Sequence, residues 1–347
     1  MRSPRPGIRT VTVRDVAKAA GVSVATVSRV LNGKSSVADE LRVRVEHASA
    51  QMRFTPHAAA RALATQRFST MGAVVPTLEE VNFSLGVSAL QRRLSTAGFT
   101  LLLASSNYDS QEEVRQVSAL LSQGVAGMML VGARHSDNVY QLLAAKGVPF
   151  VNTWVQDDTH PSVGFDNYAI GQALANYLLD LGHRDFGVIA QQSPQSDRAA
   201  KRVAGIRAAL AARGAPAPRE QLIGESHKIV DGQLAFQALM ETAHSPTAVI
   251  CGTDSLAFGA LVQAQSMGVS VPGDVSITGI NDAEFAQHLT PPLTTVRLEA
   301  GAVGARAADY LLARIGGQAV ANSTHIPFTL VVRGSTAAPR ARGHTTF

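Results

Sequence analysis

From residue 70 onward, short apolar runs alternate with amphipathic segments. The runs predict buried strands, and the segments between them have the i, i+3, i+4 apolar spacing of helices. This β-α-β-α order occurs twice, which predicts two lobes, each a parallel sheet covered by helices on both faces. The predicted strands span 71–75, 100–104, 127–131, 149–152, 185–190, 221–224, 248–251, 275–280 and 331–335. The predicted helices span 84–97, 111–123, 137–146, 168–181, 201–213, 232–244 and 256–267.

The first fifty residues show helical spacing only. Thr12 can cap a first helix, Gly21 follows where a positive φ lets the chain turn, and Ser23 can cap a second helix. Two short helices joined by a glycine turn predict a helix-turn-helix unit; a generic helical hairpin is the alternative. The expected apolar faces are Val13, Val16, Ala17 and Ala20, then Val27, Val30 and Leu31, then Leu41, Val45 and Ala48 in a third helix over 38–52.

Charge separates the same two regions. The 347-residue chain has a formal net charge of +5. Residues 1–67 hold 12 Lys and Arg against 4 Asp and Glu, or +8, which leaves 19 against 22, or −3, for the rest. Basic charge concentrated in one short segment is typical of a nucleic-acid-binding module, with a solvated basic tail as the alternative. Its coincidence with the helix-turn-helix pattern favours DNA binding.

Composition excludes several other classes. No apolar run approaches the ~20 residues of a membrane span, and residues 1–10 lack the apolar core of a secretory signal. The single cysteine, Cys251, allows no internal disulfide and is typical of a reducing compartment. A cytoplasmic protein is therefore expected. The sequence has no glycine-rich phosphate loop, zinc-ligand spacing or nucleophile elbow, so neither an enzyme nor a cofactor is predicted.

Residues 15–32 (DVAKAAGVSVATVSRVLN) resemble the head of the lactose-repressor (LacI) family of bacterial transcription regulators, matching its pattern without a gap. The resemblance implies a second helix in the major groove, where Arg29 contacts a guanine or a phosphate. Val24 and Ala25 have no hydrogen-bonding side chains, so they would read groove shape and thymine methyl groups. The implied DNA contacts are Val13, Arg14, Ser23, Val24, Ala25, Thr26, Ser28, Arg29, Asn32, Ala60 and Leu63.

Residues 60–63 (ARAL) resemble the hinge segment of the same family, and the alanine-rich stretch 57–64 around them predicts a short helix. A helix this short is marginal alone in water, so two copies packed together would fold only on DNA. Leu63 would then wedge between base steps in the minor groove; ordinary helix packing is the alternative. The family usually has asparagine after the hinge proline, whereas His57 follows Pro56 here. The resemblance therefore implies no particular contact for His57.

The resemblance extends to about residue 340 through 163–167 (VGFDN), 182–184 (GHR), 202–205 (RVAG), 253–254 (TD), 271–275 (VPGDV) and 292–296 (PLTTV). It implies a core like the periplasmic sugar-binding proteins, so the expected fold class is an all-α head on two doubly wound α/β lobes. The expected domains are the head 11–56, the hinge 57–68, the core 69–340 and a tail 341–347. The first lobe would comprise 69–166 and 297–325, and the second 167–296 and 326–340.

An effector cleft is expected at the carboxyl ends of the strands, where open α/β sheets bind ligands. Arg202 is the leading candidate, since a guanidinium suits a carboxylate or a pair of hydroxyls. Phe83 and Trp154 have core or interface packing as their alternative, Asp166 and Asp254 structural capping, and His227 a surface position. The candidates are Asn82, Phe83, Trp154, Asp166, Arg198, Arg202, His227, Asp254, Asn281 and Asp282.

Asn281 departs from the family's usual Gly-x-Asp-Asp, because the sequence here reads Gly279-Ile-Asn281-Asp282. An amide in place of a carboxylate removes one negative charge from the expected cleft. With Arg198, Arg202 and His227 also expected there, this favours a sugar acid or another small carboxylate over a neutral sugar.

These features predict a transcription regulator, most commonly a repressor in this family, that binds a palindromic DNA operator as a homodimer and responds to a small-molecule effector. The helix near 84–97, with Leu85, Ala89 and Leu90, is expected in the dimer surface. No leucine heptad follows the core, which favours a dimer over a tetramer. A solute-binding protein would share the core, but the head and the lack of a signal sequence disfavour that alternative.

Overall fold

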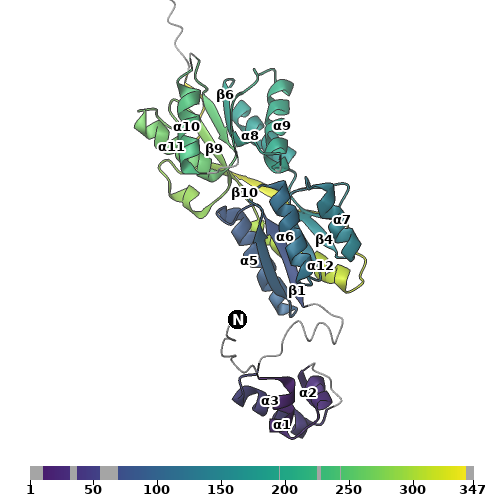
Figure 1. Ribbon diagram of the computed structural model, residues 1–347. Helices are drawn as coiled ribbons and strands as arrows, with labels where there is room; N and C mark the ends of the chain where they lie inside the picture. Colours follow the sequence, from purple (N-terminus) through teal and green to yellow (C-terminus); the bar gives the residue numbers. More distant parts are fainter. Residues whose placement is uncertain are drawn as a thin grey trace, which may run out of the picture. The chain divides into compact units, whose positions relative to one another are not determined.

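The computed structural model describes residues 11–31, 37–54, 69–194, 196–224, 228–242 and 244–340. The chain divides into two compact units, Met1–Ser69 and Thr70–Phe347, called here the head and the sensing unit (Figure 1). Asn32, His57, Ala60, Leu63 and His227 lie outside the described residues, so the predictions made for them stay predictions. Within the described residues, no helix has the length and apolar character needed to cross a membrane.

Three helices form the head: α1 (Val13–Ala20), α2 (Val24–Leu31) and α3 (Asp39–Gln51). Thr12 and Asp15 cap α1 reciprocally, with the Asp15 amide 3.3 Å from Thr12 Oγ1 and the Thr12 amide 2.9 Å from Asp15 Oδ2. Gly21 ends α1 with φ at +65°, as its turn position predicts. The buried core consists of Val16, Ala17, Ala20, Val27, Val45 and Ala48.

The first lobe of the sensing unit is built on an all-parallel sheet of order β11-β5-β4-β3-β1-β2. Its strands are β1 (Thr70–Val75), β2 (Thr100–Ser105), β3 (Met128–Val131), β4 (Phe150–Thr153), β5 (Ser162–Gly164) and β11 (Ser323–His325). Its helices are α5 (Val81–Thr96), α6 (Ser110–Ser122), α7 (Asp137–Lys146) and α12 (Ala300–Ile315). The central strands β1 and β3 are almost fully buried because helices cover both faces of the sheet, which is the predicted architecture.

The second lobe has a sheet of order β12-β10-β9-β8-β6-β7, parallel except for the antiparallel pair β10 and β12. Its strands are β6 (Phe186–Gln191), β7 (Arg219–Ile223), β8 (Ala248–Cys251), β9 (Ser276–Asn281), β10 (Thr294–Leu298) and β12 (Phe328–Val331). Its helices are α8 (Asn167–Asp180), α9 (Asp197–Ala212), α10 (Ile229–Met240), α11 (Asp254–Ser266) and the 3₁₀ helix η1 (Glu284–His288). The predicted fold class, a helical head with two α/β lobes, is confirmed.

The chain passes between the lobes at three places: from β5 to α8, from β10 to α12 and from β11 to β12. The last predicted strand, 331–335, is wrong, because β12 ends at Val331 and the following residues leave the sheet. Ser335 instead crosses the end of the second sheet. Its side chain accepts a hydrogen bond from the Thr294 amide and donates one to the Ile277 carbonyl.

Two helices begin earlier than the apolar spacing predicts. α5 begins at Val81 rather than near 84, so Asn82 and Phe83 lie in its first turn and not in a loop. α9 begins at Asp197 rather than 201, which places Arg198 and Arg202 one helical turn apart. The first turn of α9 (Asp197, Arg198) is charged and so carries little of the apolar periodicity that predicts a helix. Both helix starts point residues into the space between the lobes.

Candidate functional site

The exposed side of α2 carries the residues expected to read DNA. Val24 is 46% exposed although it is apolar, and Ala25 and Arg29 are also exposed. Ser23 and Thr26 serve the helix start: the Thr26 amide donates to Ser23 Oγ at 3.1 Å, and the two hydroxyls lie 2.9 Å apart. Arg14 is exposed, whereas Val13 and Ser28 are partly buried.

Val27 packs against α1 and α3, and this packing fixes the position of α2. Val27 is fully buried, and Arg44 of α3 donates to the Ala20 carbonyl at the end of α1 at 2.6 Å. This bond satisfies a carbonyl that has no partner within the helix. The turn between α1 and α2 is thus fixed at both ends.

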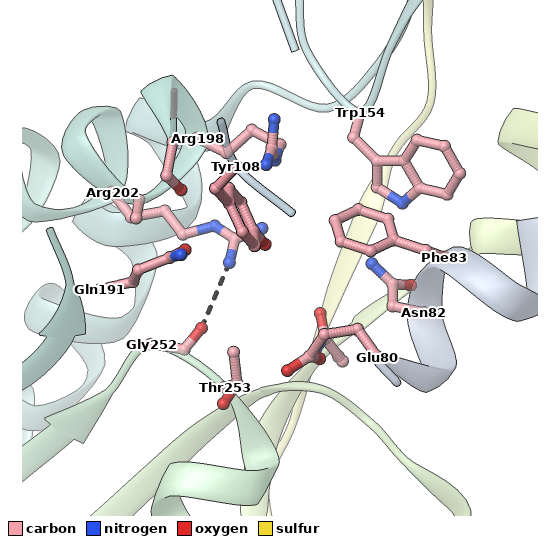
Figure 2. A pocket seen from close by; sticks show the side chains of 13 residues that line it. Glu80, Asn82, Phe83, Tyr108, Trp154, Gln191, Arg198, Arg202, Gly252 and Thr253 are labelled. Atoms are coloured by element: carbon pink, nitrogen blue, oxygen red, sulfur yellow. Dashed lines mark hydrogen bonds between the residues drawn. The ribbon is translucent and has the colours of Figure 1, made fainter. Parts of the chain in front are cut away.

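A cavity lies between the two lobes of the sensing unit, with walls from both (Figure 2). Six of the predicted effector residues line it: Asn82, Phe83, Trp154, Arg198, Arg202 and Asn281. In this conformation it encloses about 50 Å³. Ligand pockets usually span ~300–1,000 Å³, so a ligand of several carbon atoms requires the lobes or the lining side chains to move apart.

Arg202 lines this cavity and is held in place by two hydrogen bonds. Its Nε donates to Asn167 Oδ1 at 2.9 Å, and one terminal nitrogen donates to the Gly252 carbonyl at 3.2 Å. Burial, followed by the nearby charge of Arg198, lowers the pKa of Arg202 to about 10. Helix α8 lies close behind, because a Cβ at Gly171 would come 2.0 Å from the Arg202 carbonyl. Glycine at this position lets α8 support the base of Arg202.

Arg198 lies at the first turn of α9 and faces the first lobe. It is 5% exposed, with one terminal nitrogen 3.3 Å from Asp197 Oδ1 and its guanidinium carbon 5.6 Å from the centre of the Phe83 ring. Asp197 in turn accepts a hydrogen bond from the Ala133 amide at 2.8 Å. Because Ala133 belongs to the first lobe and Asp197 to the second, this bond joins the lobes beside the cavity.

Phe83 and Trp154 form the aromatic wall. Their rings meet edge to face with centres 5.2 Å apart, and both are almost fully buried. Gly86 of α5 makes this packing possible, since a Cβ there would lie 2.5 Å from the indole ring. Trp154 itself has a positive φ of 60°. Core packing and a place at the cavity are therefore not alternatives for these rings, because they do both.

Three further predicted residues do not line this cavity. Asp166 caps α8, accepting from the Ala169 amide at 2.9 Å. Asp254 is buried and accepts from Thr295 Oγ1 and the Ala283 amide, both at 2.6 Å; burial raises its pKa to about 6. Asp282 is bridged by Arg297 and Arg333, each at 2.7 Å. Asp254, Asp282 and Asn281 line an adjoining hollow of about 530 Å³, which also borders Glu80 and Asn82.

Several residues that line the cavity were not predicted from the sequence: Glu80, Tyr108, Gln191, Ser196, Ala199, Gly252 and Thr253. Glu80 lies across the cavity from Arg202 (Figure 2). Burial raises its pKa to about 7, against a lowering by Arg202. Burial also raises the pKa of Tyr108, which hydrogen-bonds Gln191 and Arg198. The available signal was position, because Tyr108 and Gln191 lie at or just past the carboxyl ends of β2 and β6.

Asn167 was also missed, although it is a positioning residue for two cavity walls. Its Nδ2 donates to the Trp154 carbonyl at 2.9 Å, while its Oδ1 accepts from Arg202. It lies within the sequence VGFDN that carried the family resemblance, but its role follows only from the fold.

Comparison with known proteins places this arrangement in a family. Residues 12–57 match the model of bacterial regulatory proteins of the lacI family, and residues 175–336 match a periplasmic binding protein-like domain. The HTH-type transcriptional repressor PurR of Erwinia tasmaniensis is 31% identical over 94% of this chain and 97% of the relative. The chain belongs to the LacI family. It is a DNA-binding transcriptional repressor of that family, and the prediction of a regulator rather than an enzyme is confirmed.

Solved structures agree with this assignment. A LacI-family transcriptional regulator from Silicibacter pomeroyi matches with a TM-score of 0.86 and 25% identity, covering 95% of this chain and all of the other. The lac repressor dimer bound to operator and the anti-inducer ONPF matches with a TM-score of 0.84 and 28% identity, again over 95% of this chain and 100% of that one. The likeness therefore spans both the head and the sensing unit.

Proposed function

We propose that this LacI-family repressor acts in the cytoplasm as a homodimer that binds a palindromic operator. A sugar or sugar-acid effector raises or lowers its affinity for that operator. The observation that carries the proposal is that one chain joins a basic head to a cavity lined from both lobes. A ligand in such a cavity favours one angle between the lobes. That angle sets the spacing of the two heads of a dimer.

Exposed apolar side chains on both lobes support the homodimer. They are Leu78, Val81 and Leu85 around the start of α5, and Leu222, Ile229, Val230 and Leu234 on β7 and α10. Leu85 is 56% exposed and Leu234 62%. Of the residues predicted for this surface, only Leu85 qualifies: Ala89 and Leu90 are buried in the core of the lobe, so their assignment to the dimer surface is wrong. Apolar groups gathered at a surface mark an interface.

The experiment has two parts. Operator sequences are selected from random DNA with the full-length protein, and binding is then measured to the whole site and to one half-site. A palindromic site bound much more tightly than its half is expected. Sedimentation of the Leu234→Glu variant should show monomers, while Ile315→Glu, an equally drastic change on the exposed end of α12, leaves the dimer intact. Equal binding to one half-site and the whole site, or a monomeric wild type, contradicts the proposal.

A further inference from the structure

The indole N–H of Trp154 is a buried donor without a hydrogen-bond partner among the described residues. Trp154 is 1% exposed, and its Nε1 contacts no acceptor within hydrogen-bond range. Its nitrogen lies on the edge of the ring that faces Phe83 and the cavity (Figure 2). Leaving a buried donor unpaired costs ~1–3 kcal/mol, so an acceptor supplied by a ligand would recover that free energy.

The arginines on the opposite wall also present donors to the cavity. Arg202 makes its two hydrogen bonds to neutral acceptors, and within the described residues no carboxylate lies at ion-pair distance from it. Arg198 has Asp197 as its counter-ion, hydrogen-bonds Tyr108 and lines the cavity. A buried guanidinium is stabilised most by an anion bound through two oxygens. The cavity is therefore rich in donors and in positive charge.

Resting on the proposed function, we infer that the effector is a small organic carboxylate. Its oxygens accept hydrogen bonds from Arg198, Arg202 and Trp154 Nε1, and it binds together with one proton that Glu80 takes up from solvent. The proton is needed because an ionised Glu80 would place a second negative charge in the same small space. Protonated Glu80 can instead donate a hydrogen bond to a ligand hydroxyl.

The surroundings of Glu80 favour such a proton. Burial raises its pKa to about 7; Arg202 lowers it, and Asp254 and Glu79 raise it. The charged and titratable groups around Glu80 come from several elements: Glu79 beside it, Arg92 of α5, Tyr108 past β2, Arg198 and Arg202 of α9, Asp254 of α11, Asp282 and Glu284 past β9, and Arg297 and Glu299 at β10. Arg202 is the cation that an incoming carboxylate would neutralise, and its neutralisation removes the charge that keeps Glu80 ionised.

Trp154 is the single tryptophan of the chain, so its fluorescence reports this cavity in the full-length protein. The probes are gluconate, glucuronate and galacturonate, each compared with glucose or galactose at pH 6, 7 and 8. We expect at least one acid to give a saturable change and to bind at least ~10-fold more tightly than its neutral counterpart. Its affinity should fall above pH 7, approaching ~10-fold per pH unit, the limit for uptake of one proton.

Variants assign the effect to individual groups. Arg198→Gln should weaken acid binding at least ~10-fold, and Arg198→Lys, which keeps a counter-ion for Asp197, should weaken it through the lost guanidinium geometry. Glu80→Gln should bind the acid equally well at pH 6 and 8. The matched controls are Arg207→Gln, on the exposed side of α9, and Glu241→Gln, at the exposed end of α10; both should behave as wild type. Trp154→Phe, followed by calorimetry, removes the N–H and should weaken binding.

The inference is overturned if no acid binds, if a neutral sugar binds as tightly as its acid, or if acid binding is independent of pH in the wild type. Operator binding by the effector-free protein is measured separately. A protein that binds its operator but no acid contradicts the carboxylate alone, whereas a protein that binds no operator contradicts the proposed function itself.

Discussion

The head and the interlobe cavity differ in how far apart along the chain their residues lie. The head is complete within α1 to α3, and its capping pair, Thr12 and Asp15, is three residues apart. The cavity gathers residues from Glu80 to Asn281, and its Arg202–Asn167 bond joins positions 35 residues apart. The head therefore depends on a few local contacts, and the cavity on the packing of two whole lobes.

The largest effect should come from breaking the small core of the head. In Val27→Asp a carboxylate replaces a fully buried side chain, and an unpaired buried charge costs about 3–5 kcal/mol. The head should unfold and operator affinity fall by at least roughly 100-fold, while the sensing unit keeps its thermal transition. Val43→Asp, on an exposed position of α3, is the control. Loss of folding in both units would show that they are not independent.

The second effect tests the long-range support of the cavity. Asn167→Leu has a similar size but removes the acceptor for Arg202 and the donor to the Trp154 carbonyl. Loss of these buried partners costs ~1–3 kcal/mol, so effector affinity should fall roughly 5–150-fold. Operator affinity without effector should not change. Asn176→Leu, elsewhere on α8, should leave both properties intact, and an unaltered effector response in Asn167→Leu would refute the positioning role.

A third and comparable effect should arise at the exposed surface of the head. Arg29→Gln should weaken operator binding by ~1–3 kcal/mol. If Arg29 contacts a base, discrimination between operator variants falls at one position. If it contacts a phosphate, binding weakens for every sequence, and the slope of log affinity against log salt concentration falls by about 1. Arg213→Gln removes the same charge from the sensing unit and should have no effect. Wild-type binding by Arg29→Gln would exclude both roles.

The smallest effect concerns pH and the stability of the second lobe. His183 is buried, with Nδ1 at 2.9 Å from Thr247 Oγ1 and Nε2 at 2.9 Å from the Ala337 carbonyl. Burial lowers its pKa below the usual 6.5, so the folded state keeps a neutral ring that the unfolded state would protonate. The stability it contributes is present above pH 6.5 and is lost as pH falls below that value. Melting curves from pH 7.5 to 5 should show this decline, which His183→Asn should reduce.

The same contrast explains what the sequence could predict. Thr12, Gly21 and Ser23 act on residues within one turn of themselves, so the head's helices follow from spacing alone. The two lobes could be predicted from the alternation of apolar runs with helical segments. A buried parallel strand appears in the sequence as an apolar run, whichever strand it pairs with. Glu80 and Asn167 could not be found this way, since each acquires its role from residues on other elements, whereas Tyr108 could have been found from its position just past the carboxyl end of β2. For Asp166 and Asp254 the sequence left ligand contact and structural capping open; in the structure Asp166 caps α8 and Asp254 accepts from Ala283 and Thr295.

We propose that the cavity and the head are coupled through one chain. The most direct test is Trp154 fluorescence titration of a bound acid with the full-length protein, alone and with saturating operator. Coupling requires the operator to change effector affinity by the same factor by which the effector changes operator affinity. Equal, reciprocal factors clearly different from one are the predicted result. An effector affinity that is identical with and without operator would contradict the account.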